Sequence, residues 1–235
     1  MVAAADRTRV SVIIPTLNEA VSLPHTLAAL QGLRRRGHEV ILVDGGSSDA
    51  TVSVARPLVD TVLEAARGRA VQLQAGAMAA SGAVLWFLHA DTRAPQQADR
   101  LIASALQDAG TGWGRFDVQL SERRITLRLV AALMNFRSRL SSIATGDQGI
   151  FVRRELYAAV GGFPALPLME DIALSRALRR HGRPAVIRQP LQSSPRRWEQ
   201  HGVIRTILLM WGLRLAYFAG VNPGRLARFY QPHQP

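Results

Sequence analysis

Short apolar segments alternate with longer amphipathic segments along the first half of the chain. The apolar segments cover residues 10–14, 40–43, 59–63 and 83–88, and they are too short for helices, so they are predicted to be strands. Residues 19–36, 68–81 and 96–108 have helical spacing and follow strands in order. Strands that alternate with helices predict an α/β fold with a mainly parallel sheet covered on both faces.

The second half of the chain has a more mixed pattern. Residues 114–120 and 149–152 are predicted to be strands, and residues 125–140 and 167–180 to be helices. No repeat, low-complexity tract or clear linker interrupts the sequence. We therefore expect one domain over residues 1–202, followed by a helical extension over residues 203–235.

The extension begins with an apolar segment, residues 203–220, that contains Arg205 and Arg214. An arginine near the centre of a membrane span costs roughly 2.5–3.5 kcal/mol on insertion scales. The pattern therefore favours an amphipathic helix that packs on the domain or lies on a membrane surface over a helix that spans the bilayer.

Polar clusters follow three of the predicted strands, at residues 15–19, 44–46 and 89–91. In open α/β sheets ligands bind beyond the carboxyl ends of the strands, so the three clusters are expected to meet at one ligand site. His89 and Asp91 are two residues apart and point the same way in an extended chain. This makes the pair a candidate metal site.

Charge and composition narrow the classes of partner. The chain of 235 residues has a net charge of +12, carried by arginine, and contains no cysteine. The charge predicts attraction to anionic lipid or to phosphate-bearing substrates. Nucleic acid is not expected as a partner, because the chain has no RNA-binding aromatic motif, zinc finger or helix-turn-helix signature.

Two further features bear on location. The lack of cysteine excludes disulfides and thiolate metal sites and fits a reducing compartment. The N-terminus lacks the long apolar region of a secretory signal. We therefore expect a cytoplasmic protein that binds peripherally to the inner face of the cell membrane.

Five motifs occur in the order seen in family 2 glycosyltransferases. They are Val-Ser-Val-Ile-Ile-Pro-Thr-Leu-Asn-Glu (10–19), Val-Asp-Gly-Gly-Ser-Ser-Asp-Ala-Thr (43–51), Gly-Arg-Ala-Val-Gln (68–72), His-Ala-Asp-Thr (89–92) and Met-Glu-Asp-Ile (169–172). The chain most resembles a small bacterial subgroup associated with arsenosugar and carotenoid-type glycoside pathways. The resemblance implies a GT-A fold, a nucleotide-diphosphate sugar donor, a divalent metal, Mn²⁺ or Mg²⁺, and an inverting mechanism.

The resemblance assigns the donor side to residues of the first half. Asp44 would face the uracil or an equivalent base, Pro15, Thr16 and Glu19 would line the other side, and Arg69 would reach the base or the phosphates. Each has an alternative: Asp44 can organise a turn, Glu19 can be a charge at a helix N-terminus, and Arg69 can be a solvated arginine.

The metal position falls on Asp91, which matches the second aspartate of the family's Asp-x-Asp motif. His89 replaces the first aspartate. Carboxylate oxygen suits Mg²⁺, and imidazole also suits Mn²⁺, so both residues are candidate metal ligands. The alternative for both is a polar strand end without a metal.

Asp171 matches the family's catalytic base, which deprotonates the acceptor hydroxyl. Adjacent side chains at a helix start diverge, so Asp171 and Glu170 are not expected to share a proton. Both can instead be N-terminal helix charges. The remaining candidates, for the acceptor and diphosphate side, are Gly146, Asp147, Gln148, Glu170, Arg196, Arg197 and Trp198.

The sequence therefore predicts a metal-dependent inverting glycosyltransferase that uses a UDP-linked sugar and a hydroxyl on a small or lipid-like acceptor. Two alternatives remain open. A nucleotidyltransferase usually has a glycine-rich, lysine-bearing loop near the N-terminus, which this chain lacks. A catalytically degenerate, membrane-associated scaffold stays possible because of the departure at His89.

Overall fold

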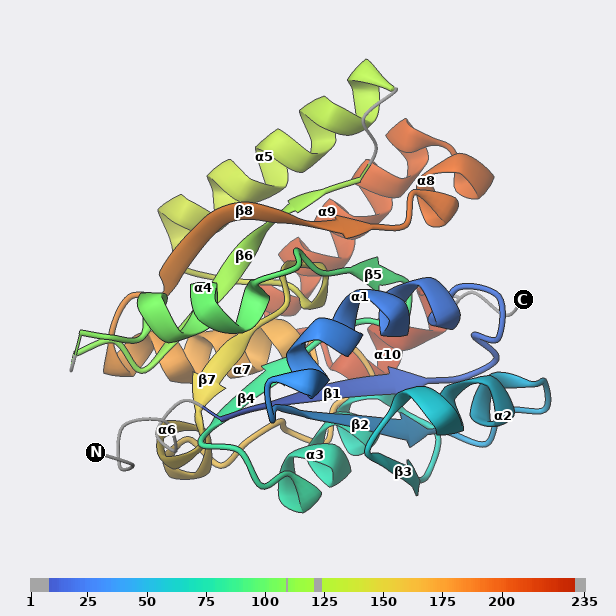
Figure 1. The fold of residues 1–235 in the computed structure, drawn as a ribbon. Coiled ribbons are helices and arrows are strands. Elements are labelled where there is room, and N and C mark those ends of the chain that lie inside the picture. Colours follow the sequence, from blue (N-terminus) through green and yellow to red (C-terminus); the bar gives the residue numbers. More distant parts are fainter. Residues whose placement is uncertain (1–8, 109, 121–123, 231–235) are drawn as a thin grey trace.

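The protein is described by a computed structural model that covers residues 9–108, 110–120 and 124–230 (Figure 1). Its centre is an eight-stranded sheet in the order β3-β2-β1-β4-β7-β6-β8-β5. The strands are β1 (Val10–Thr16), β2 (Glu39–Asp44), β3 (Thr61–Glu64), β4 (Val84–Phe87), β5 (Thr92–Arg93), β6 (Trp113–Gln119), β7 (Phe151–Arg153) and β8 (Ala185–Ser193). The α-helices are α1 (Leu23–Arg35), α2 (Thr51–Ala55), α3 (Arg69–Ala79), α4 (Ala98–Ala105), α5 (Ile125–Ser141), α6 (Arg154–Ala159), α7 (Glu170–Leu178), α8 (Arg196–His201), α9 (Val203–Phe218) and α10 (Pro223–Phe229).

The first half of the sheet is parallel, as the sequence pattern predicts. β1 pairs with β2 and β4, and β2 pairs with β3, all in parallel. In this register Thr16 lies opposite Asp44, at the carboxyl ends of their strands. The polar clusters that follow β1, β2 and β4 therefore leave the sheet at the same edge.

The second half of the sheet is mixed. β7 is antiparallel to both β4 and β6, whereas β8 is parallel to β6. The strand predicted at 149–152 is confirmed but begins only at Phe151, because residues 146–148 form a 3₁₀ turn, η3. The long β8 was not predicted because Arg188, Gln189 and Pro190 interrupt its pattern. The register between β6 and β8 shifts beside these residues, and such an irregularity accommodates a proline inside a sheet.

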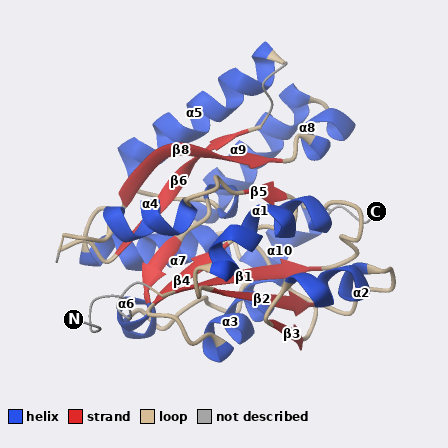
Figure 2. Ribbon diagram, in the orientation of Figure 1, coloured by secondary structure: helices blue, strands red, loops and turns tan. Residues whose placement is uncertain are grey.

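Helices cover both faces of the sheet, as Figure 2 shows. Alternation along β1 separates two cores, since neighbouring side chains point to opposite faces. Val12 and Ile14 pack with side chains of α1 and α4, while Ile13 packs with Leu73 of α3 and Leu174 of α7. The predicted two-sided burial is therefore confirmed.

The C-terminal helices pack on the rest of the domain. α9 buries Thr206 and Leu213, and Leu213 shares a small core with Leu226 of α10 and Ile172 of α7. Val203 and Ile207 pack against the core that α5 forms with the end of β6. The amphipathic helix predicted from residue 203 is confirmed, and the segment around Arg196 forms the short helix α8.

Of the helices within the described ranges, none has both the length and the apolar character that crossing a bilayer requires.

Helix α3 approaches the sheet closely because it has a glycine at the contact. A Cβ atom on Gly76 would lie 2.9 Å from Val43 Cγ2 and would overlap Ile13 Cγ2. Overpacking a core destabilises a protein by roughly 1–3 kcal/mol. The higher helix propensity of alanine relative to glycine offsets only about 1 kcal/mol of this.

We therefore expect Gly76→Ala to lower the free energy of unfolding by about 1 kcal/mol, measured by urea denaturation. Gly212 of α9 is the matched control, because it is exposed and a Cβ atom there would meet nothing within 4 Å. Gly212→Ala should leave stability unchanged or raise it. Equal effects at the two positions would contradict the close packing of α3.

Candidate active site

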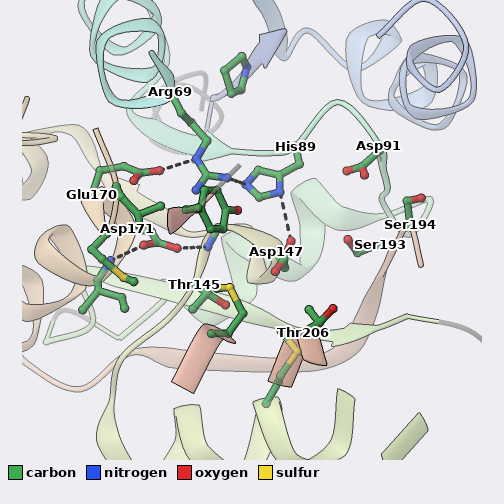
Figure 3. Close-up of a pocket in the computed structure, with 18 of the residues that line it drawn as sticks. Arg69, His89, Asp91, Thr145, Asp147, Glu170, Asp171, Ser193, Ser194 and Thr206 are labelled. Carbon is green, nitrogen blue, oxygen red and sulfur yellow. Dashed lines mark hydrogen bonds and ion pairs between the residues drawn. The ribbon is translucent and has the colours of Figure 1, made fainter. Parts of the chain in front are cut away.

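A cavity of about 580 Å³ opens at the edge where the parallel strands end (Figure 3). Its walls come from the loops after β1 and β4, the starts of α3 and α7, the η3 turn, and one face each of α5 and α9. Most of the residues predicted from the sequence line it: Pro15, Thr16, Glu19, Arg69, His89, Asp91, Gly146, Asp147, Glu170, Asp171, Arg196 and Trp198.

Asp44 does not line this cavity. Its buried carboxylate accepts hydrogen bonds from the backbone N–H groups of Gly46 and Ser47, at 3.0 and 2.7 Å, and from Thr16 Oγ1 at 3.1 Å. In this conformation Asp44 organises the turn after β2, which is the alternative that the sequence left open.

Gln148 is also turned away from the cavity. It is fully buried, forms a reciprocal capping interaction with Thr145, and donates a 3.3 Å hydrogen bond to Asn135 Oδ1 of α5. Gln148 therefore braces the η3 turn that presents Gly146 and Asp147. The side chain of Arg197 lies outside the described part of the chain.

Arg69 and Glu170 form an ion pair at the base of the cavity, through Arg69 Nε and Glu170 Oε1. The Glu170 side chain is only 2% exposed. Burial alone would lower the pKa of Arg69, but the charges of Glu170, Tyr230 and Asp171 outweigh it and raise that pKa. The pair joins the first turn of α3 to the first turn of α7.

His89 lies between Arg69 and Asp147. Its Nε2 is 3.4 Å from Arg69 Nη1, and its Nδ1 is 3.3 Å from Asp147 Oδ1. A guanidinium can only donate, so a hydrogen bond from Arg69 requires an unprotonated Nε2 and leaves the proton on Nδ1. Burial lowers the pKa of His89, but the hydrogen bond to Asp147 and the charges of Asp147 and Asp91 raise it overall.

Gly146 makes room for this arrangement, since a Cβ atom there would overlap His89 Nε2. Both ring nitrogens of His89 thus face protein groups in the structure, and its role as a metal ligand stays a prediction.

Asp91 follows β4 and faces the cavity among other charges (Figure 3). Burial raises the pKa of its carboxyl group; His89 and Arg196 oppose this shift, and Asp147 and Glu19 add to it. Arg196 Nη2 is 3.8 Å from Asp91 and 3.1 Å from Glu19. The short pairing of β5 with β8 brings this α8 arginine to the loop after β4.

Asp171 is held by the backbone at the other side of the cavity. Its Oδ2 accepts a 2.8 Å hydrogen bond from the N–H of Gly146, and its Oδ1 accepts a 2.7 Å hydrogen bond from the N–H of Ile172. Met169, at the start of α7, has a φ of +67°, which turns the chain sharply into the helix. Glu170 and Asp171 diverge as predicted, since Glu170 contacts Arg69 and Asp171 contacts the η3 turn.

Sequence reasoning assigned no role to several residues that line the cavity, above all Arg137 of α5 and Arg214 of α9. The spacing of residues along the two helices indicates that both arginines face the cavity. Arg137 lies seven residues after Val130, and Arg214 lies seven residues after Ile207, so each arginine shares the inward face of its helix.

The Glycosyl transferase family 2 model matches residues 11–157. Among curated proteins, the chain is 33% identical over 161 residues to an undecaprenyl-phosphate 4-deoxy-4-formamido-L-arabinose transferase of Pseudomonas fluorescens. That match covers 61% of this chain and 46% of the relative. The chain thus spans about half the length of the curated relatives it matches.

Solved structures give the same picture of the fold. A mannosyltransferase of Pyrobaculum calidifontis in complex with GDP-Man and Mn²⁺ superposes with a TM-score of 0.58 and 26% identity, over 77% of this chain and 55% of that one. Staphylococcus aureus TarS superposes with a TM-score of 0.64 and 15% identity, over 86% of this chain and 65% of that one. The predicted GT-A fold is confirmed.

The Arg69–Glu170 pair generates a prediction about stability. Arg69→Met leaves the buried Glu170 carboxylate without its partner. Breaking a fully buried pair costs about 3–5 kcal/mol, and the Arg69 side chain is 35% exposed, so we take the lower figure, about 3 kcal/mol. We expect a loss of that size in the free energy of unfolding, measured by urea denaturation.

Glu199→Gln is the control, because it breaks the exposed contact of 3.7 Å with Arg124 and should change stability by less than about 1 kcal/mol. An equally small effect of Arg69→Met would mean that the buried pair does not stabilise the fold.

Proposed function

The chain belongs to glycosyl transferase family 2, and from that premise we propose that it transfers a sugar from a UDP-linked donor to a hydroxyl of a lipid-like acceptor, with inversion at the anomeric carbon. One observation carries the proposal. Asp91 and Asp171 face the same cavity from different sides, with His89 and Asp147 between them (Figure 3). Inverting displacement needs such a separation of the leaving group from the base.

The donor diphosphate is assigned to the side of Asp91. The described residues hold no group of three or more histidine, aspartate and glutamate side chains that could enclose a metal ion. Mg²⁺, however, is commonly bound by one or two carboxylates together with substrate phosphates. Burial, followed by the charges of Asp147 and Glu19, raises the pKa of Asp91, and a bound cation would favour the charged carboxylate there.

Asp91 is the residue that would hold a divalent metal, Mn²⁺ or Mg²⁺, which would neutralise charge on the departing diphosphate. Arg196 is close enough to Asp91 and Glu19 to reach the same phosphates. A guanidinium presents a planar fork that suits phosphate oxygens.

Asp171 is assigned as the general base. Its two backbone hydrogen bonds fix the carboxylate, and a carboxylate has further lone pairs to accept an acceptor hydroxyl. In the reaction the hydroxyl proton passes to Asp171, the acceptor oxygen bonds to the anomeric carbon, and the bond from that carbon to the diphosphate breaks. One base is enough, because the metal would stabilise the departing diphosphate, so that no second carboxylic acid is needed to protonate it.

Asp171→Asn should lower the transfer rate at least about a hundredfold and leave binding of UDP with Mn²⁺ unchanged. Asp91→Asn, the matched variant on the donor side, should weaken that binding. Calorimetry measures binding, and release of UDP from a panel of UDP-sugars measures turnover. Near-normal transfer by Asp171→Asn would contradict the assignment of Asp171 as the general base. A wild-type protein without metal-dependent UDP binding would favour the scaffold alternative.

The lipid-like acceptor is supported by the outer surface of α5 and α9. Large apolar side chains are exposed along both helices, among them Ile125, Leu129, Phe136 and Leu140 of α5, and Ile204, Leu208, Leu215 and Phe218 of α9. Contiguous exposed apolar surface marks an interaction site. α5, α9 and α10 contain no acidic residue, and they expose arginines such as Arg128, Arg205 and Arg228.

This combination of apolar and basic side chains suits the surface of an anionic membrane. The names of the curated relatives refer to undecaprenyl phosphate, a lipid. We therefore assign the segment from residue 203 two roles, as a wall of the cavity and, with α5, as a membrane-facing surface.

Replacing Ile204 and Leu208 by serine should weaken binding to vesicles that contain phosphatidylglycerol roughly tenfold, because apolar area is lost from the contact. Vesicle flotation measures this binding, and added salt should weaken it further. Met78→Ser, at an exposed apolar position on α3, is the control and should have no effect. Unchanged binding by the double variant would show that this face does not contact the membrane.

A further inference from the structure

The cavity has an apolar limb that the transfer chemistry does not use. It runs between α5 and α9 and is lined by Val130, Leu133 and Met134 on one side and by Ile207 and Met210 on the other. These spacings place each set on one face of its helix. The limb thus leads from the polar part of the cavity along the two helices that carry the exposed apolar surface.

Two arginines stand where the limb meets the polar chamber. Arg137 and Arg214 line the cavity, each seven residues beyond an apolar residue of the limb, Val130 or Ile207. Seven residues of α-helix rise about 10.5 Å, so each arginine lies about that far along its helix from Val130 or Ile207. Among the nearby carboxylates, Asp171 and Asp147 act on both arginines, which places the pair beside the proposed base.

Several nitrogen atoms of these two guanidinium groups have no partner among the described residues. Nε and Nη2 of Arg137 and Nε of Arg214 are buried without a hydrogen-bond partner among the described residues. Neither arginine takes part in an ion pair within that part of the chain. Buried polar groups in proteins are normally hydrogen-bonded, so cationic donors that face a cavity without a partner are suited to binding an anion.

The electrostatics agree with this picture. Burial, together with repulsion from Arg214, lowers the pKa of Arg137 to about 10, although Asp171 opposes the shift. Burial also lowers the pKa of Arg214. An anion bound between the two guanidinium groups would raise the pKa of both arginines.

We propose that Arg137 and Arg214 bind a phosphate group of an amphiphilic acceptor, whose aliphatic chain lies in the limb between α5 and α9. That the ligand is an acceptor rests on the proposed transfer reaction. The phosphate site itself is inferred from the guanidinium nitrogens that have no hydrogen-bond partner. A bound phosphate would also anchor the acceptor next to Asp171, within the same chamber. The aliphatic chain would leave the limb toward the membrane-facing surface.

The donor diphosphate is the competing occupant. Arg196 lies 3.8 Å from Asp91 and 3.1 Å from Glu19, whereas Asp171, the proposed base, acts on Arg137 and Arg214. Asp147 acts on both groups, because it raises the pKa of Asp91 as well. The two arginines therefore belong with the base side of the cavity, and a ligand that they hold need not displace the donor.

Octyl phosphate is a suitable probe, with 1-octanol and inorganic phosphate as comparisons. Trp198 and Trp211 line the cavity, so tryptophan fluorescence reports a ligand there, and calorimetry measures its affinity. We expect octyl phosphate to bind at least tenfold more tightly than either comparison, because only it carries both the anion and the chain. Equal affinity for octyl phosphate and 1-octanol would overturn the proposal.

Arg137→Met and Arg214→Met should each weaken octyl phosphate binding at least tenfold, and Arg137→Lys should retain part of it. Arg100→Met and Arg188→Met are controls, since they remove exposed arginines that neither line the cavity nor belong to the membrane-facing surface. Thermal melting tests folding, and removing either half-buried arginine, whose guanidinium group forms no ion pair within the described residues, is not expected to lower the melting temperature. Wild-type affinity in both methionine variants would overturn the proposal.

Binding of UDP with Mn²⁺ separates this proposal from the function itself. The two methionine variants should bind UDP as the wild type does, and a loss of UDP binding with octyl phosphate binding intact would assign the arginines to the donor and overturn the acceptor site. If the wild type binds octyl phosphate but shows no metal-dependent UDP binding, the transferase proposal fails while the anion site stands.

Discussion

The ion pair between Arg69 and the buried Glu170 connects the two halves of the chain at the candidate active site. Arg69 opens α3, from the parallel half of the sheet, and Glu170 opens α7, more than a hundred residues later. Because successive helix residues point in different directions, turning Glu170 toward Arg69 leaves Asp171 facing the η3 turn and the cavity. The same guanidinium contacts His89, so one interaction orients groups on three separate elements.

The high positive charge of the chain is divided among different environments. Arg69 and Arg115 are compensated by carboxylates inside the protein, and Arg196 lies at the cavity beside Glu19 and Asp91. Arg137 and Arg214 face the cavity without partners among the described residues, while others lie on the outer surface of α5, α9 and α10. The net charge of +12 therefore does more than attract polyanions in general, because some of the arginines that carry it line one cavity.

Much of the first half could be predicted from the sequence because its signals are local. Strands such as β1 are short, apolar and followed by polar residues, and parallel neighbours must end at one edge, so Thr16, His89 and Asp91 were predicted to be near each other. The second half was harder. β8 contains Pro190 and polar residues within a bulged register, and its pairing with β6 comes from long-range contacts that no periodicity encodes.

The sequence by itself determined the α/β order, the edge where the ligand site lies, and the residue types that such a site needs. Only the tertiary structure decided how those residues are used. The Asp44 carboxylate accepts hydrogen bonds from backbone N–H groups of the turn after β2, whereas the buried Gln148 donates to Asn135 Oδ1 and accepts from the N–H of Thr145. The tertiary structure also turned Arg214, which in the sequence only weakens a membrane span, toward a cavity that exists because α5 and α9 pack side by side.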